Sequence, residues 1–464
     1  MAAAGFLLLE MAWACVMPLF RGPDEIGHVY RASAIASGQW GPSGGETPTR
    51  ASSEIVRAAT SVCHELYDDF RPEVCTASTT YDDGTVGVAS SADKYNPVYY
   101  AIAGLPARFL DGGTAVWAMR LASALLCALL LGFAWAILGT GARTPFPAIT
   151  FMLATTPAVA YSGSVFAPNG VQFASAFVLW AGVLVVLRDR GSGKLAATAC
   201  GLGGTLLVVT HTTGTLWLAT IMVTTLVLAG WRSLWGIVRT NSRAWTLAVA
   251  SVVLAGLGAV AWVLGAATNS PGAGGEPLSQ ETKDIGVVPN VILWVLQTVG
   301  TMPYRFGILW PVLYLLWLVP LGTFLVLGFR RADGRHRAAI LTVVALSVLV
   351  PTVLTVMTYA ELGIAWQGRY GLPLLVGALL VAGEALERAA PALRRGALGT
   401  VAVVLAVTHY LCVLCIGLRE SAGPFDDGRP WTLILSLGAP ALVFGGYVLL
   451  TRSGVPRSGA PRRG

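Results

Sequence analysis

Residues that could do chemistry gather in one short segment, Arg21-Gly-Pro-Asp-Glu-Ile-Gly-His-Val-Tyr-Arg31, directly after the first apolar stretch of the chain. Pro23 followed by two acids is typical of a helix start. If Asp24 opens that helix, His28 lies four residues on and Arg31 seven, so the three side chains share one face. A carboxylate, an imidazole and a guanidinium held together suit general acid–base chemistry. The same spacing also suits a polar helix whose charges only face water.

The long segment that follows closes with a second polar cluster, Lys94-Tyr-Asn-Pro-Val-Tyr-Tyr100. This cluster brings a cation, an amide and three aromatic rings back toward the first segment. Four of its residues are therefore candidates for binding a substrate: Lys94, Tyr95, Asn96 and Tyr99. Aromatic rings beside a membrane are also ordinary interface anchors, so the tyrosines on their own do not separate the two roles.

The elements that position these residues are transmembrane helices. The chain of 464 residues is 55% hydrophobic and only 12% charged, whereas soluble domains carry roughly a quarter charged residues. Apolar stretches of about 17 to 25 residues, long enough to cross the hydrocarbon, recur along nearly the whole chain. We expect an all-α integral membrane protein with about twelve spans, near 3–20, 115–138, 145–163, 170–187, 195–211, 214–230, 244–266, 308–329, 337–357, 371–387, 397–417 and 431–450.

Basic residues gather in the short connections on one side of these spans, and the positive-inside rule makes that side cytoplasmic. They are Arg143, Arg188, Arg190, Lys194, Arg232, Arg239, Arg243, Arg330, Arg331, Arg335, Arg337, Arg388, Arg394, Arg395, Arg452, Arg457, Arg462 and Arg463. Both termini are then cytoplasmic, and the net charge of +7 reflects topology rather than nucleic-acid binding. The stretch 1–20 lacks the basic flank and cleavage site of a signal peptide, so we expect a retained span in a natural chain that starts earlier.

The opposite, extracytoplasmic side carries two long loops, 21–114 and 267–307. Pro97 to Leu110 is apolar but too short for a span, and counting it as one would turn every later basic loop outward. We therefore expect a short juxtamembrane helix at the outer interface there, and a similar interfacial helix over 287–302.

Residues 1–450 are expected to form a single membrane domain, followed by a disordered cytoplasmic tail at 451–464. Cys63 and Cys75 lie in the first loop, in an oxidising compartment, so we expect a disulfide between them. The richness in Ala, Gly and Arg suggests a bacterial genome of high GC content, which places the protein in a bacterial cytoplasmic membrane.

Four motifs carry a resemblance: the Pro-Asp-Glu-x-x-His-x-x-Arg pattern, Asn96-Pro-Val-Tyr-Tyr100, Arg120-Leu-Ala-Ser-Ala-Leu and Gln367-Gly-Arg-Tyr370. In these motifs and in layout the chain resembles a family of uncharacterised bacterial multi-pass membrane proteins. That family is similar to the GT-C glycosyltransferases, a superfamily that includes protein O-mannosyltransferases and aminoarabinose transferases.

The resemblance implies a GT-C-like fold, a polyprenyl-phosphate sugar donor, an acceptor that is an envelope glycan or protein, and a catalytic carboxylate in the first outer loop. By position that carboxylate matches Asp24, with Glu25 as the next candidate. Many relatives carry a second acid after an Asn, where this chain has Asn169 followed by Gly170. A two-carboxylate or metal site is therefore in doubt; no cofactor and no metal ligands are predicted, although a divalent metal would be compatible with the chemistry.

In this hypothesis Asp24 takes the proton of the acceptor hydroxyl as it attacks the anomeric carbon. Arg369 and Lys94 bind the donor phosphate, His28 orients Asp24 or the acceptor, and Arg31, Arg120, Asn169 and Tyr370 complete the substrate contacts. Three of these residues have a plainer alternative: Arg369 snorkels to the lipid headgroups or pairs with Glu361, Arg120 anchors its span, and His28 is solvated.

Two further residues are expected to be structural. His211 lies in a tight turn between threonines, and Glu10 lies inside the first span, where we expect a protonated carboxyl bonded to a neighbouring helix.

Two other classes of function fit the membrane architecture. One is a transporter or flippase of lipid-linked glycans, which commonly has broken helices and ion sites at the membrane midplane. The other is a non-catalytic membrane protein whose long loop binds envelope glycans. Because the polar cluster lies at the surface and buried charges are sparse, the sequence favours surface chemistry over transport.

Overall fold

A computed structural model describes residues 2–43, 47–66, 77–189, 192–266, 280–303, 307–362, 366–389 and 395–420, with the side chains of 63–66, 280–289, 360–362 and 395–398 left out. Its architecture is all-α and multi-pass, as the apolar stretches predict. Among the described residues, eight helices are long and apolar enough to cross a membrane. Helices α11 (Gly214–Ala229) and α12 (Trp231–Thr240) make a ninth if that bent pair is one span.

The helices of the bundle are α1 (Ala2–Val16), α6 (Gly112–Gly139), α7 (Phe146–Ala154), α8 (Pro157–Ser164), α9 (Asn169–Arg188), α10 (Gly193–Thr210), α11 (Gly214–Ala229), α12 (Trp231–Thr240), α13 (Ser242–Gly265), α14 (Gln280–Val299), α15 (Pro311–Arg331), α16 (Gly334–Leu362), η3 (Gly368–Gly371), α17 (Leu372–Ala389) and α18 (Arg395–Arg419). Helix α9 is buried almost throughout and packs on α6, α10 and α17, whereas α13 buries little of its surface.

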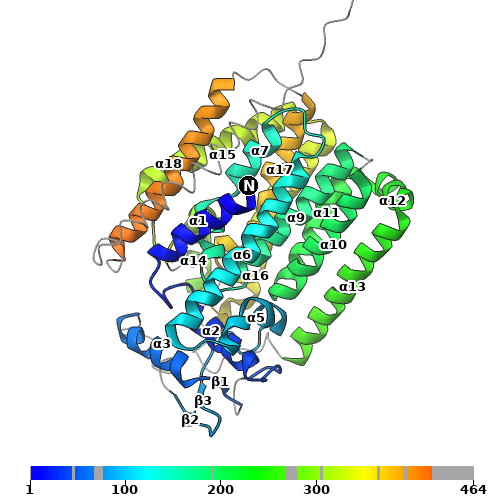
Figure 1. The fold of residues 1–464 in the computed structure, drawn as a ribbon. Helices are drawn as coiled ribbons and strands as arrows, with labels where there is room; N and C mark the ends of the chain where they lie inside the picture. The colour runs from blue at the N-terminus through cyan, green and yellow to red at the C-terminus, as the bar shows by residue number, and fades with distance from the viewer. Residues whose placement is uncertain are drawn as a thin grey trace, which may run out of the picture.

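The first loop forms a compact layer at one end of the bundle, at the bottom of Figure 1. Its elements are α2 (Glu25–Ala36), β1 (Thr49–Ser52), α3 (Ser53–Leu66), β2 (Thr79–Thr80), β3 (Thr85–Val88), α5 (Pro97–Ala103) and η1 (Leu105–Arg108). The strands form a small antiparallel sheet of order β1-β3-β2, with Thr49 opposite Val88. We call this end of the bundle, with the α8–α9 and α10–α11 turns and η3, the loop end.

Several expected spans differ in detail. One continuous span over 145–163 was expected and is wrong: Thr156 caps a new helix with Pro157 in its first turn, so the segment divides into α7 and α8. The helix after 214 bends by 98° at Gly230, whose φ is +75°. The expected span at 431–450 and the tail at 451–464 lie outside the described residues. Pro97 to Leu110 does form short helices, α5 and η1, as expected.

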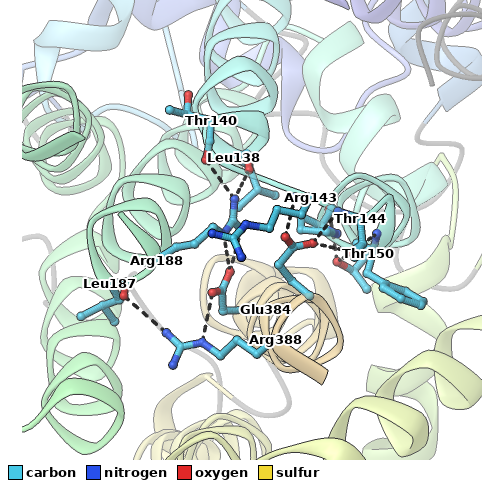
Figure 2. A network of polar contacts seen from close by, with 12 residues as sticks. Leu138, Thr140, Arg143, Thr144, Thr150, Leu187, Arg188, Glu384 and Arg388 are labelled. Atoms are coloured by element: carbon cyan, nitrogen blue, oxygen red, sulfur yellow. Dashed lines mark hydrogen bonds and ion pairs between the residues drawn. The ribbon is translucent and has the colours of Figure 1, made fainter. Parts of the chain in front are cut away.

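The opposite end, which we call the far end, holds a tight network of charges (Figure 2). Glu384 of α17 accepts from Arg188 of α9 at 2.6 Å and from Arg388 at 3.3 Å. Arg188 also donates to the carbonyl of Leu138, at the end of α6, at 2.8 Å. These contacts tie α6, α9 and α17 together. Glu387 of α17 also binds the α6–α7 turn, by accepting from the backbone N–H groups of residues 143 and 144.

Candidate active site at the loop end

A fully buried ion pair fixes the start of α2. Glu25 and Arg120 are both 0% exposed, and the guanidinium of Arg120 on α6 donates from Nε at 2.7 Å and from Nη2 at 2.6 Å to the two carboxylate oxygens. Glu25 also accepts from the N–H groups of Gly22 and Phe166. Burial works to raise the pKa of Glu25, but the charge and hydrogen bonds of Arg120 outweigh it and the pKa lies below its ordinary value.

The other donors of Arg120 are also used, on the carbonyls of Ala14, Met17 and Pro18 at the end of α1. Both members of the pair are therefore saturated, and their geometry is that of a structural clamp between α1, α2 and α6. Glu25, the next candidate for the catalytic carboxylate after Asp24, and Arg120, expected to contact the substrate, are the two members of this clamp.

Asp24, the immediate neighbour of Glu25, is in the opposite situation. Its side chain is exposed and does not cap α2. Within the described residues the carboxylate accepts no hydrogen bond and forms no ion pair. Its backbone has a φ of 55°, a left-handed conformation that Asp tolerates better than most residues. The clamp at Glu25 holds this turn, so the Asp24 carboxylate is presented free at the end of the helix.

His28 lies one turn along α2 and is only 4% exposed. Its Nδ1 lies 2.7 Å from the hydroxyl of Tyr100, and its ring meets Tyr95 edge-on at 5.3 Å. Burial first, and the positive charge of Arg369 to a smaller extent, lowers the pKa of His28 to about 4, against the opposing effect of Asp24. The imidazole is therefore neutral near pH 7, so its role is to orient neighbouring groups through hydrogen bonds.

A chain of rings continues from His28 toward the membrane helices. Tyr95 contacts His211 at 5.5 Å, and His211 contacts Tyr370 at 6.1 Å. His211 is fixed by Thr213, whose N–H lies 3.2 Å from Nδ1, and burial lowers its pKa to about 3, with His28 and Arg369 adding to the effect. His211 was expected to be structural, and its place beside the site follows only from the packing of α10 against the first loop.

Arg369 is the cation of this site. It lies in η3, is 8% exposed, and has its guanidinium 5.5 Å from the ring of Tyr370. Its Nε is buried with no hydrogen-bond partner, and no carboxylate pairs with it in the part of the chain that the structure describes. The side chain of Glu361, its expected partner, lies outside that part. This burial argues against an arginine that snorkels to the headgroups.

The backbone next to Arg369 is fixed by close packing. A Cβ atom at Gly368 would lie 1.9 Å from the carbonyl oxygen of Trp294 on α14, so only glycine fits there. The Gly368 N–H donates to Gln297 at 2.5 Å. Helix α14 therefore sets the direction in which Arg369 leaves η3.

A narrow cleft joins Arg369 to Asn169 and to Pro23, the residue before Asp24. Its volume is about 10 Å³, room for about one water molecule. Among the residues that the structure describes, the buried Nδ2 atom of Asn169 also has no hydrogen-bond partner. Two unpaired donors from η3 and α9 thus line one cleft beside Asp24.

Gly170 explains why a second acid is missing next to Asn169. A Cβ atom there would lie 2.4 Å from the carbonyl oxygen of Ser162 and 2.7 Å from Cα of Gly163, because the start of α9 presses on α8. Among the described residues, no three His, Cys, Asp or Glu side chains meet closely enough to hold a metal ion.

The remaining candidates surround the site rather than line the cleft. Arg31 is buried and donates to the carbonyls of Gly41 at 2.7 Å, Trp40 and Tyr95, so it braces the first loop. Asn96 caps α5 by accepting from the Val98 N–H. The remaining two are Tyr99, which donates to Ser123 on α6, and Lys94, which is half-buried with its carbonyl accepting from Trp262.

Two other expectations concern residues away from the cleft. The expected disulfide falls on Cys75 and on the side chain of Cys63, which lie outside the described residues. Glu10 is buried in α1, but among the described residues neither of its carboxyl oxygens has the hydrogen bond to a neighbouring helix that was expected.

Comparisons with known proteins place the chain in a family. The family model described as "Predicted membrane protein (DUF2142)" matches residues 7–378. No curated protein matches the sequence.

Two solved structures are similar, both of ArnT from Cupriavidus metallidurans. The one bound to undecaprenyl phosphate is 13% identical, with a TM-score of 0.48 over 96% of this chain and 76% of that one. The apo structure is 14% identical, with a TM-score of 0.44 over 97% and 75%. A likeness of this size assigns no activity to this chain.

Proposed function

We propose that this chain, which belongs to the DUF2142 family of predicted membrane proteins, is a membrane glycosyltransferase. In this proposal it moves a sugar from a polyprenyl-phosphate donor to a cell-envelope acceptor at the outer face of a bacterial cytoplasmic membrane. The proposal is supported by the motifs of the first loop and by what the loop end leaves unsatisfied.

The observation that carries the proposal is the buried guanidinium of Arg369 without a carboxylate partner among the described residues. A buried charge is costly unless it is paired, so an anion is expected to complete the site. A guanidinium suits phosphate because its planar set of N–H groups matches phosphate oxygens. Asn169 offers a neutral donor to the same anion.

Asp24 supplies the general base, which sugar transfer needs and phosphate binding alone does not. As general base it takes the proton of the acceptor hydroxyl while that oxygen forms a bond to the anomeric carbon. The bond from this carbon to the phosphate oxygen breaks, and the phosphate leaves with the electron pair beside Arg369. Neutral His28 holds the acceptor hydroxyl or the carboxylate in place, since it is itself fixed by Tyr100. The cleft is narrower than a phosphate, so donor binding must widen it.

Sugar transfer by the purified full chain tests the proposal. The protein in lipid vesicles is given a panel of radiolabelled polyprenyl-phosphate sugars together with envelope extract as acceptor. The wild type should transfer at least one sugar. Arg369→Ala should weaken donor use by about a hundredfold or more, the loss typical of a donor that stabilises developing charge, and Arg369→Lys should weaken it less.

Arg50→Ala is the matched control, because Arg50 also lies at the loop end, in an exposed pair with Asp83, and such pairs contribute little. Full activity of Arg369→Ala would remove the phosphate site. If the wild type bound the donors without transferring any sugar, the flippase or the glycan-binding protein would replace the enzyme.

A further inference from the structure

A second cavity lies at the loop end, on the side of His211 toward α13. Its volume is about 220 Å³, and it is bordered by α10, the start of α11, the end of α13 and the first loop. Helices α10 and α13 pack side by side, with α13 on the outside of the bundle (Figure 1). None of its lining residues belongs to the Arg369 cleft.

The walls of this cavity are apolar and its polar groups are neutral. Val208, Ala259 and Val263 are among its apolar residues, and its polar residues are Asn96, His211, Thr212 and Thr215, with the indole of Trp262. His211 is uncharged near pH 7, since burial lowers its pKa to about 3. The lining therefore suits hydroxyl groups and hydrocarbon, in contrast to the cationic cleft at Arg369.

The cavity is bordered in part by residues of α13 that are exposed at the surface. Val260 and Leu264 line it and are 46% and 75% exposed. They lie on an apolar helix long enough to span a membrane, so their exposed surfaces face lipid chains. The cavity wall at Trp262 is linked to the first loop, because the indole N–H of Trp262 donates to the carbonyl of Lys94 at 2.9 Å.

One residue connects the cavity with the candidate active site. His211 lines the cavity and also contacts Tyr95 and Tyr370, which lead to His28 and to Arg369 respectively. A group held against His211 would thus contact the residue that joins the cavity, through Tyr95, to His28.

We propose that this cavity binds the sugar acceptor, and that the acceptor is an amphiphile with a neutral, hydroxyl-bearing head group that enters sideways from the lipid bilayer. That the ligand is a sugar acceptor rests on the proposed function. The chemistry of the ligand rests on the cavity lining alone. A volume of about 220 Å³ is below the roughly 300 to 1,000 Å³ of sites that enclose a whole small molecule. It therefore holds the part of the amphiphile next to the head group, and the remaining chain stays in the bilayer.

Binding of two probes to the full chain in nanodiscs, measured by native mass spectrometry, tests this. Dioctanoylglycerol stands for a neutral hydroxylated amphiphile, and farnesyl phosphate stands for the lipid phosphate. Ala259→Trp fills the cavity and should lower the affinity for dioctanoylglycerol by about tenfold, which corresponds to about 1.4 kcal/mol, with farnesyl phosphate unchanged. Leu257→Trp is the control, since Leu257 lies on the same helix, is 64% exposed and does not line the cavity.

Thr215→Val serves as the second variant, because it removes a polar group without adding volume and should also weaken dioctanoylglycerol alone. If either cavity variant weakened farnesyl phosphate instead, the cavity would belong to the donor and the inference would be wrong. Unchanged binding of dioctanoylglycerol in both variants would overturn it as well. Arg369→Ala separates the two proposals: unchanged farnesyl phosphate binding there counts against the proposed function, whereas the dioctanoylglycerol results judge the cavity.

Discussion

Buried charges are treated differently at the two ends of the bundle. At the far end, Glu384 is held by Arg188 and Arg388, and Glu387 is used by backbone N–H groups (Figure 2). At the loop end, Arg369 is buried with an unpaired Nε, and Asp24 is exposed with no side-chain partner among the described residues. Because an unpaired buried charge costs stability, a fold keeps one where a ligand completes it. The far end therefore only holds helices together, whereas the loop end has both a structural pair, Glu25 with Arg120, and these unpaired groups, which make it the place to look for binding.

The same contrast exists between two neighbouring residues, and there it predicts the largest effects. Asp24→Asn should lower the rate of sugar transfer by about 10² to 10⁴, the usual contribution of a general base. The melting temperature should not change, because the Asp24 side chain has no partner among the described residues. Glu25→Gln should instead destabilise the protein by about 3 to 5 kcal/mol, since Arg120 is left buried and uncompensated. Transfer assays and thermal unfolding in detergent measure the two. Full activity of Asp24→Asn would exclude it as the base.

At the far end, Glu384→Gln tests the structural half of the comparison. The variant leaves Arg188 without its carboxylate, and we expect a loss of about 3 kcal/mol in unfolding free energy, at the lower end for a buried pair because Arg188 keeps its bonds to carbonyls. The KM for the donor, measured on the remaining folded protein, should not change. A raised KM with an unchanged melting temperature would mean that the far end also takes part in function.

The sequence predicts most of the membrane-spanning helices, because apolar length is a local property, but it misses the break within 145–163 and the short first helix, Ala2–Val16. Helical spacing places His28 and Arg31 on α2, yet both are buried while Asp24 is exposed ahead of the helix. The sequence does not separate Asp24 from Glu25, since the difference depends on Arg120 almost a hundred residues away. The small sheet was not predicted, because its strands have two to four residues and lack a clear alternation. Arg369 lies beside Asn169, and His211 contacts Tyr370, only through the packing of η3, α9 and α10. The need for glycine at position 170 depends on the close packing of α8 against the start of α9, which the sequence does not show.

Asn169 offers a finer test of the loop end. Asn169→Leu removes the second unpaired donor of the cleft while keeping a side chain of similar size. A hydrogen bond to a charged group is worth about 1.5 to 3 kcal/mol, so the KM for the lipid-phosphate donor should rise about tenfold or more, less than with Arg369→Ala. Donor titration in the transfer assay measures this. An unchanged KM would show that Asn169 does not contact the donor.

The two buried histidines of the loop end predict the smallest effect, a dependence of stability on pH. The pKa of His28 is lowered to about 4 and that of His211 to about 3, from an ordinary value of 6.5. Below pH 6.5 these histidines bind protons in the unfolded chain but stay neutral in the folded protein, down to their lowered pKa values. Their contribution to stability is therefore complete above pH 6.5 and falls as the pH is lowered. Each histidine should cost up to about 1.4 kcal/mol for every pH unit below 6.5.

Melting temperatures of the wild type and of His28→Gln between pH 7.5 and 5 measure this dependence. The window stays above the range in which Glu25 would protonate, since its pKa lies below the ordinary 4.5. The wild type should lose stability across the window, and His28→Gln should lose less because the protonation site at position 28 is gone. If the two proteins had the same slope, His28 would not be held neutral by burial, and it could then carry a charge beside Asp24.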